Sequence, residues 1–191
     1  EEEFRPDYLQ VNASYIIVSS KSGILLVDQQ LAHQRILYEK FEKATMVAIP
    51  VQKNLIPQTF HLTPPDAVLL QSLLPEFLLL GYEIEEFGAN TFIIQGVPAD
   101  LAGGREAESI EKILEAYKHH AQDVRLDKRE RLIRTLSVQK AIPPGRKLTH
   151  TEMEKLMQDL FVCEQPQLSP SGKRIMTKLS ATDIASLIQH A

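Results

Sequence analysis

Two short aliphatic runs near the start of the chain, followed at once by a helical pattern, constrain the fold most. Tyr15–Val18 and Ile24–Val27 are separated by the polar stretch Ser19–Gly23, which predicts two antiparallel strands joined by an extended turn. Asp28 is suited to cap a helix, and a partly apolar face over Gln29–Lys43 predicts that helix. The chain therefore begins as strand, strand, helix.

The middle of the chain combines extended segments with one apolar helix. Pro50–Pro57 is bounded by prolines and predicts an extended segment, and Thr63–Asp66 predicts the start of a helix that runs to Gly81. Tyr82–Phe87 and Thr91–Gln95 flank a Gly-Ala-Asn turn, which predicts a second hairpin.

The next part of the chain has three helical patterns in succession. Glu106–His120 and Lys128–Ala141 are the first two, and a third follows Thr149, where Thr149 and Glu152 have the spacing of a capping box. We expect these three helices to belong to one lobe.

The chain closes with a predicted strand over Arg174–Leu179 and a helix from Thr182. A terminal strand and helix need partners, and the economical arrangement packs them against the N-terminal hairpin and helix. The fold class is therefore α+β, with a mixed sheet in the lobe made from both chain ends and an inserted lobe that is largely helical with a β-hairpin. The expected parts are residues 8–50 with 163–191, residues 51–162, and residues 1–7 as the end of a polar linker.

Composition bounds the class of protein. Hydrophobic residues make up 43% and charged residues 24%, and no apolar run approaches the roughly 20 residues of a membrane helix. The one cysteine cannot form an internal disulfide and no signal-like leader opens the sequence, so we expect a soluble, cytoplasmic chain. A net charge of −4 gives no global attraction to nucleic acid, so contact with DNA would be weak, local or shared with other domains.

The stretch Asp28–Glu39, with the sequence D-Q-Q-L-A-H-Q-R-I-L-Y-E, carries a resemblance. It resembles the signature helix of the MutL C-terminal domain, D-Q-H-A-x-x-E-x-x-x-x-E, and Gly81–Asp100 and Cys163–Lys173 are similar to later stretches of that family in the same order. The resemblance implies a homodimer formed by the lobe from both chain ends, with the inserted lobe external. It implies no cofactor for this domain, because ATP is expected only in the family's N-terminal ATPase domain.

The departures from this family concern a divalent-metal site that its nuclease-active members build. Asp28 and Glu39 remain, but four ligand positions of those members are here Gln30, Gln34, Ser169 and Ser171. A carboxylate and an imidazole one helical turn apart converge on one ion, whereas neutral amides are much poorer ligands. A middle motif is reduced to Ser137–Lys140 without its cysteine. We therefore expect neither a metal nor catalysis in this domain.

The polar residues that remain also have structural interpretations. Asp28 is more simply a helix cap, and Glu39 a surface ion-pair partner of Arg35 at helical spacing. His33 is offset around the helix from the family's histidine, which favours a surface or packed histidine over a ligand. Cys163 has no identifiable activating residue, which favours structural burial.

The segment Gln52–Pro57 offers a second function. Its Gln52, Leu55, Ile56 and Pro57 resemble the Q-x-x-L-x-P peptide by which bacterial DNA-processing proteins dock onto the replication sliding clamp. An extended, proline-stiffened peptide loses little entropy on binding. The competing interpretation is an edge strand whose aliphatic side chains belong to the core.

A basic cluster around one predicted helix offers a third possible function, contact with DNA. Arg125, Lys128, Arg129, Arg131 and Arg134 suit contact with DNA phosphates. Interspersed acidic residues and the lack of aromatics favour a solvated helix face instead.

The resemblance thus implies a non-catalytic dimerisation module of mismatch repair, which couples the ATPase domains and a MutS signal to downstream factors. The alternative is a divergent metal-dependent DNA endonuclease. An unrelated dimeric scaffold that shares only the helix motif is a third possibility.

Overall fold

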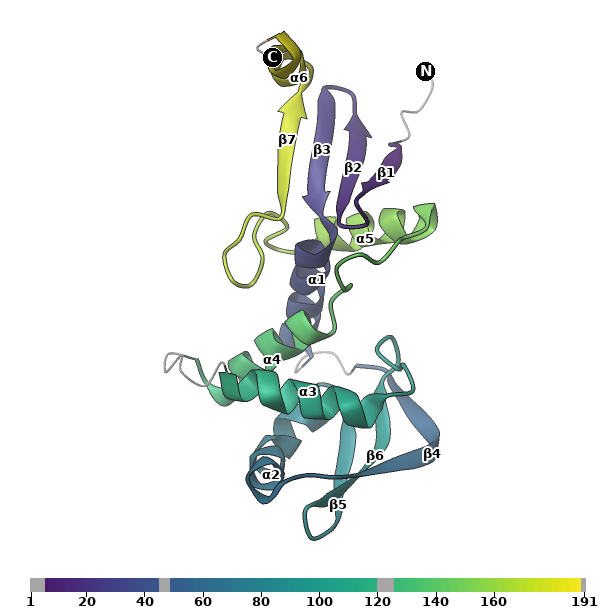
Figure 1. Ribbon diagram of the computed structural model, residues 1–191, viewed down its shortest axis with the longest axis vertical. Helices are drawn as coiled ribbons and strands as arrows, with labels where there is room; N and C mark the ends of the chain where they lie inside the picture. Colours follow the sequence, from purple (N-terminus) through teal and green to yellow (C-terminus); the bar gives the residue numbers. More distant parts are fainter. Residues whose placement is uncertain (1–5, 45–48, 120–125, 190–191) are drawn as a thin grey trace. The chain divides into compact units, whose positions relative to one another are not determined.

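The computed structural model describes residues 6–44, 49–119 and 126–189. The chain divides into two compact units, one made of residues 1–39 with 140–191 and the other of residues 40–139 (Figure 1). We call them the terminal unit and the middle unit. Each combines helices with an antiparallel sheet, so the expected α+β class is confirmed.

The sheet of the terminal unit has the order β1-β2-β3-β7 (Figure 1). Its strands are β1 (Tyr8–Val11), β2 (Tyr15–Ser20), β3 (Gly23–Asp28) and β7 (Met176–Ser180). Every neighbouring pair is antiparallel, so the expectation of a mixed sheet was wrong. The reason lies at the end of β3, where Asp28 N donates to Ile175 O at 2.9 Å. The chain thus returns to the end of β3 and runs back along it. Strand β1 was not foreseen from the sequence.

The turn between β2 and β3 is tighter than expected. Ser20 pairs with Gly23, so the turn contains only Lys21 and Ser22 and the neighbouring serines belong to β2. Gly23 has φ +142°, and a Cβ there would lie 2.1 Å from Leu179 O on β7. Glycine at this position therefore allows β7 to approach β3 closely.

Three helices have residues in the terminal unit: α1 (Gln29–Lys43), whose last turn belongs to the middle unit, α5 (His150–Val162) and α6 (Ala181–Gln189). The capping box of α5 is confirmed, because Thr149 Oγ1 accepts from Glu152 N and Glu152 accepts from Thr149 N. The core joins the inner sheet face to α5, as in the cluster of Ile16, Val27, Met153, Leu156 and Leu160.

The position of α5 corrects the expected division of the chain. Residues 51–162 were expected to form the inserted lobe, with α5 as its third helix, but the inserted unit is residues 40–139. Helix α5 has an apolar stripe at helical spacing, and that stripe packs against β2 and β3. The sequence shows such a stripe without showing which sheet covers it.

The middle unit has a three-stranded antiparallel sheet with the order β4-β6-β5. Its strands are β4 (Val51–His61), β5 (Glu83–Gly88) and β6 (Thr91–Pro98), and its helices are α2 (Pro64–Leu79), α3 (Glu106–His119) and α4 (Lys128–Gln139). The expected hairpin is confirmed as β5-β6. The expected extended segment is a longer strand that pairs with β6, so this unit is less helical than expected.

Candidate functional site

Asp28 and Glu39, the two motif residues that remain, lie at different levels of α1. Asp28 Oδ1 accepts from Leu31 N at 2.9 Å, which confirms the helix cap. Glu39 follows three turns later, about 16 Å along the axis at 1.5 Å per residue. The two carboxylates therefore do not converge on one ion.

Glu39 instead holds a loop that comes late in the chain, which we call the late loop (residues 164–175). Its two oxygens accept from Glu164 N at 2.8 Å and Gln165 N at 3.1 Å. Arg35 forms an ion pair with Glu39 at 3.7 Å and donates to Leu168 O at 2.6 Å. The ion pair was expected but its surface location was wrong, since the two side chains are only 7% and 6% exposed. This anchoring role of Glu39 was not foreseen from the sequence.

The serines of the late loop take part in its turn. Ser169 is buried, its hydroxyl accepts from Lys173 N at 3.0 Å, and it lies 3.1 Å from the hydroxyl of the exposed Ser171. Gln34 on α1 is buried and Gln30 is half-buried. Within residues 6–44, 49–119 and 126–189, no group of three or more His, Cys, Asp and Glu side chains is placed to hold a metal ion. At positions 30, 34, 169 and 171 the chain offers only neutral amide and hydroxyl groups, which are poor ligands for a divalent ion.

His33 and Cys163 have structural contacts. His33 Nδ1 accepts from Ile142 N at 2.9 Å, which confirms a packed histidine that ties α1 to the segment after α4. Cys163 is half-buried, with its sulfur 3.5 Å from Asp159 O at the end of α5.

The outer face of the terminal sheet is apolar and open. Leu9, Ile17 and Leu26 are cross-strand neighbours in one row, and Ile24 and Leu179 form a second pair. Side chains on this outer face are half-buried or exposed, with Leu9 61% exposed, whereas the inner face contains the core. We call the outer side chains the open face, which comprises Leu9, Tyr15, Ile17, Ile24, Leu26 and Leu179.

The segment Gln52–Pro57 lies on β4 of the middle unit, where the pairing with β6 is interrupted by a bulge between Lys53 and Gln58. Gln52 and Pro57 are exposed, and Leu55 and Ile56 are 101% and 84% exposed. The interpretation that these aliphatic side chains belong to the core is therefore wrong. Binding to a clamp stays a prediction.

The basic residues of α4 are partly engaged within the middle unit. Arg134 pairs with Glu130 at 2.5 Å, and the Arg131 guanidinium lies 5.3 Å from the centre of the Tyr117 ring. Lys128 is exposed, and Arg125 lies outside the described residues. These contacts favour a structural role for the arginines, and phosphate contact stays a prediction.

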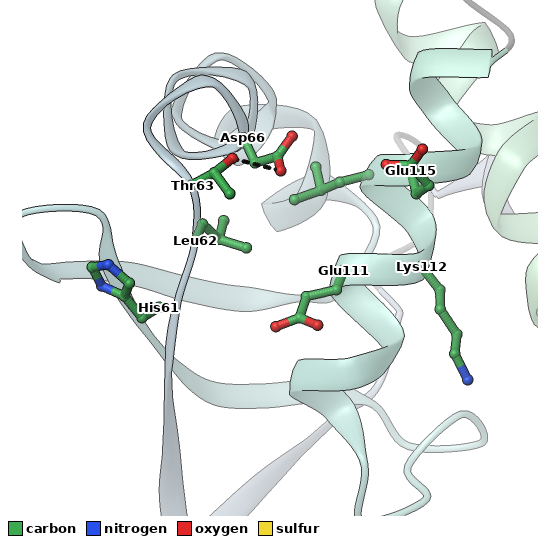
Figure 2. A pocket seen from close by; sticks show the side chains of 8 residues that line it. His61, Leu62, Thr63, Asp66, Glu111, Lys112 and Glu115 are labelled. Carbon is green, nitrogen blue, oxygen red and sulfur yellow. Dashed lines mark hydrogen bonds between the residues drawn. The ribbon is translucent and has the colours of Figure 1, made fainter.

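Figure 2 shows a hollow of about 450 Å³ in the middle unit, between the start of α2 and helix α3. Asp66 accepts from Thr63 Oγ1 at 2.8 Å and pairs with Lys118 at 3.0 Å, and Lys118 also pairs with Glu115 at 2.6 Å. Lys118 therefore offsets part of the negative charge of the carboxylates that line this hollow.

Glu106 at the start of α3 is a buried carboxylate that was not foreseen from the sequence. Its Oε1 accepts hydrogen bonds from the N–H groups of Gly103 at 3.2 Å and Gly104 at 2.8 Å, which come shortly before it in the chain. An acidic residue just after a glycine pair, at the start of a helical pattern, was the available signal.

The chain thus folds into two α+β units, one of which has an open apolar sheet face. The chain belongs to the family described as the MutL C terminal dimerisation domain, whose model matches residues 8–148. It is 32% identical over 93% of its length to the DNA mismatch repair protein MutL of Pelodictyon phaeoclathratiforme. It is 33% identical over 95% of its length to the protein of the same name from Chlorobaculum tepidum.

These matches cover 29% of each relative, so the chain spans less than a third of their length. None of the helices in the described ranges is long and apolar enough to cross a membrane.

Proposed function

We propose that this chain is a non-catalytic homodimerisation module of DNA mismatch repair. The observation that carries the proposal is the open face, an apolar sheet surface in the unit built from both chain ends. Apolar surface of this kind gains free energy when a second copy covers it, and a two-fold dimer uses the same patch on both copies. The names of the relatives support the link to mismatch repair.

Within a longer protein, this dimerisation would couple N-terminal ATPase domains and pass a signal from MutS to downstream repair factors. The domain itself would need no cofactor, with ATP bound by the ATPase domain.

Sedimentation velocity tests the dimer. We expect the chain to be dimeric at tens of micromolar and an interface above roughly 1,000 Å². Leu9→Lys and Ile17→Lys should each shift the equilibrium to monomer, because a charge on the open face would be buried unpaired. Val162→Lys is the matched control, since Val162 is 82% exposed at the end of α5 in the same unit. A monomeric parent chain would contradict the proposal.

The absence of catalysis is tested by nicking of supercoiled DNA with Mn²⁺. The buried Ser169 hydroxyl and the amides at positions 30 and 34 support an inactive domain, since such neutral groups are poor ligands. We expect no nicking above background. Reproducible nicking that Asp28→Asn abolishes would establish the alternative, a divergent metal-dependent endonuclease.

A second candidate function is docking onto the replication sliding clamp by Gln52–Pro57. The full exposure of Leu55 and Ile56 supports it, because an apolar groove on a partner could receive both side chains without unfolding the middle unit. We expect a Kd from about one to hundreds of micromolar, since a six-residue segment buries little surface.

Replacing Gln52 and Leu55 by alanine should abolish clamp binding and leave dimerisation unchanged. Leu78→Ala is the matched control, because Leu78 is 63% exposed on α2 of the same unit. Titration of the parent chain that gives no signal would rule out this candidate.

A further inference from the structure

A polar hollow of about 350 Å³ lies beside the Gln52–Pro57 segment in the middle unit. Strand β4 contributes Gln52, Asn54 and Gln58, and the stretch before α3 contributes two glycines and Glu106. Among the described residues that line the hollow, Glu106 is the only one with a charged side chain. The hollow therefore carries a net negative charge.

Glu106 has one satisfied and one unsatisfied oxygen. The residue is only 6% exposed, and its Oε1 accepts from Gly103 N and Gly104 N. Oε2 is buried and has no hydrogen-bond partner among the residues that the structure describes. A buried carboxylate oxygen without a donor is unfavourable, so a donor that reaches it gains free energy.

The carboxyl of Glu106 is charged at neutral pH. Burial raises the pKa of Glu106. Hydrogen bonds from the N–H groups of Gly104, Glu106 and Gly103, together with the Gln58 amide, lower the pKa by more than burial raises it. The net pKa of Glu106 lies below its ordinary value. The unsatisfied oxygen is therefore an anionic acceptor.

Two amides beside Glu106 also leave oxygen acceptors. Asn54 Nδ2 donates to Ile94 O at 3.2 Å, and Gln58 Nε2 donates to Gly104 O at 3.5 Å. The Asn54 nitrogen is thus used on the backbone, whereas the Gln58 nitrogen also faces the Glu106 carboxyl, and the oxygens of both amides remain as acceptors. One carboxylate with neutral amides is a weak set for a divalent ion, whereas a guanidinium has five donors in a plane and loses hydration more readily than an ammonium.

The approach to Glu106 has room for a side chain to enter. A Cβ added at Gly103 or Gly104 would meet no atom within 4 Å, so the space beside this glycine pair is open. Leu55 and Ile56 line the same hollow and are exposed. A partner that covers these two side chains therefore reaches the hollow as well.

We propose that the hollow receives a basic side chain, of the arginine type, from the protein that docks on Gln52–Pro57. The proposal rests on clamp docking as proposed above and deepens it: the two aliphatic side chains supply apolar contact, and Glu106 supplies a charged contact that fixes orientation.

Clamp titration with three chains tests the proposal. Glu106→Gln keeps the shape and an acceptor for the glycine N–H groups but removes the charge, so it should weaken binding about tenfold and reduce its salt dependence. Glu108→Gln makes the same charge change at an exposed position on the first turn of α3 and should bind as the parent does. Thermal unfolding and sedimentation of both variants show whether the fold is kept.

A second measurement does not depend on the clamp. Backbone amide NMR shifts of Gly103 and Gly104 are followed while blocked arginine, blocked lysine or neutral blocked citrulline is added. Shifts that appear with arginine or lysine, but not with citrulline and not in Glu106→Gln, support binding of a basic side chain in the hollow. The amino acid that gives the larger shifts identifies which basic side chain the hollow prefers.

The two proposals fail in different ways. If the parent chain and Glu106→Gln bind the clamp equally, the role of the hollow is overturned while clamp docking stands. If no chain binds the clamp, clamp docking fails, and the amino-acid titration decides whether the hollow takes a basic group. No shift with either basic probe then overturns the proposal.

Discussion

At the scale of single residues, Glu39 joins α1 to the late loop. It accepts from two backbone N–H groups of that loop and pairs with Arg35, and both side chains are buried. Removal of one member of such a pair leaves a buried charge without its partner, which costs more than the pair itself contributes.

We expect Glu39→Ala to lower the free energy of unfolding by about 3 kcal/mol, because Arg35 and two N–H groups lose their acceptor. Urea unfolding followed by circular dichroism measures this change. Glu154→Ala, at an exposed position of α5, should change it by less than about 0.5 kcal/mol. An equal, small effect of both substitutions would show that the Glu39 network is weak.

Asp66 gives a prediction on pH. The Lys118 ammonium and then the Thr63 hydroxyl lower the pKa of Asp66 below its ordinary value. A carboxyl with a lowered pKa in the folded chain adds stability above its unfolded pKa, and that stability is lost as the pH falls through the folded pKa.

The stability difference between the parent chain and Asp66→Asn should therefore be largest near neutral pH and shrink between about pH 5 and pH 2. Urea unfolding over this range measures it. Lys118→Gln should reduce the pH dependence, because it removes the main cause of the shift. A difference that stays constant with pH would contradict the ion pair.

At the scale of elements, helix α5 starts at a reciprocal cap and packs by an apolar stripe. Thr149 Oγ1 accepts from Glu152 N at 3.2 Å, and Glu152 accepts from Thr149 N at 2.8 Å. The cap could be recognised from the Thr-x-x-Glu spacing because both bonds are local. The packing partner of the helix could not be recognised from the sequence, because it is distant in the chain.

Thr149→Ala should lower the free energy of unfolding by about 1 kcal/mol, since the Glu152 N–H loses its acceptor at the first turn. Thr151→Ala, two residues further along and exposed, is the control and should have little effect. Chemical unfolding of both variants provides the measurement. A loss of the same size in both would indicate an effect other than capping.

At the scale of the whole molecule, the terminal unit depends on both ends of the chain. Strand β7 pairs with β3 along five positions, from Gly23↔Ser180 to Val27↔Met176. Deletion of the residues after Cys163 removes β7 and α6, so it should expose the edge of β3 and leave the chain aggregated or monomeric. Sedimentation velocity distinguishes these outcomes from the dimer, and a truncated chain that still dimerises would contradict the proposed dimer unit.

The sequence by itself determined what depends on neighbours in the chain. The bounds of α1, the β2-β3 and β5-β6 hairpins, the Asp28 cap and the stop of α2 before Gly81 all follow from turn residues and periodicity over a few positions. The pattern of Asp28–Glu39 also indicated the family, and the family model confirms it.

Only the tertiary structure decided which elements meet. The apolar stripe of α5 suits either unit in the sequence, and its packing on β2 and β3 depends on residues more than 100 positions away. The same holds for Glu39, whose partners Glu164 and Gln165 are distant in the chain, and for the exposure of Leu55, which follows from a bulge in the pairing of β4. Local patterns specify elements because their hydrogen bonds are local, whereas packing depends on long-range contacts that no single segment encodes.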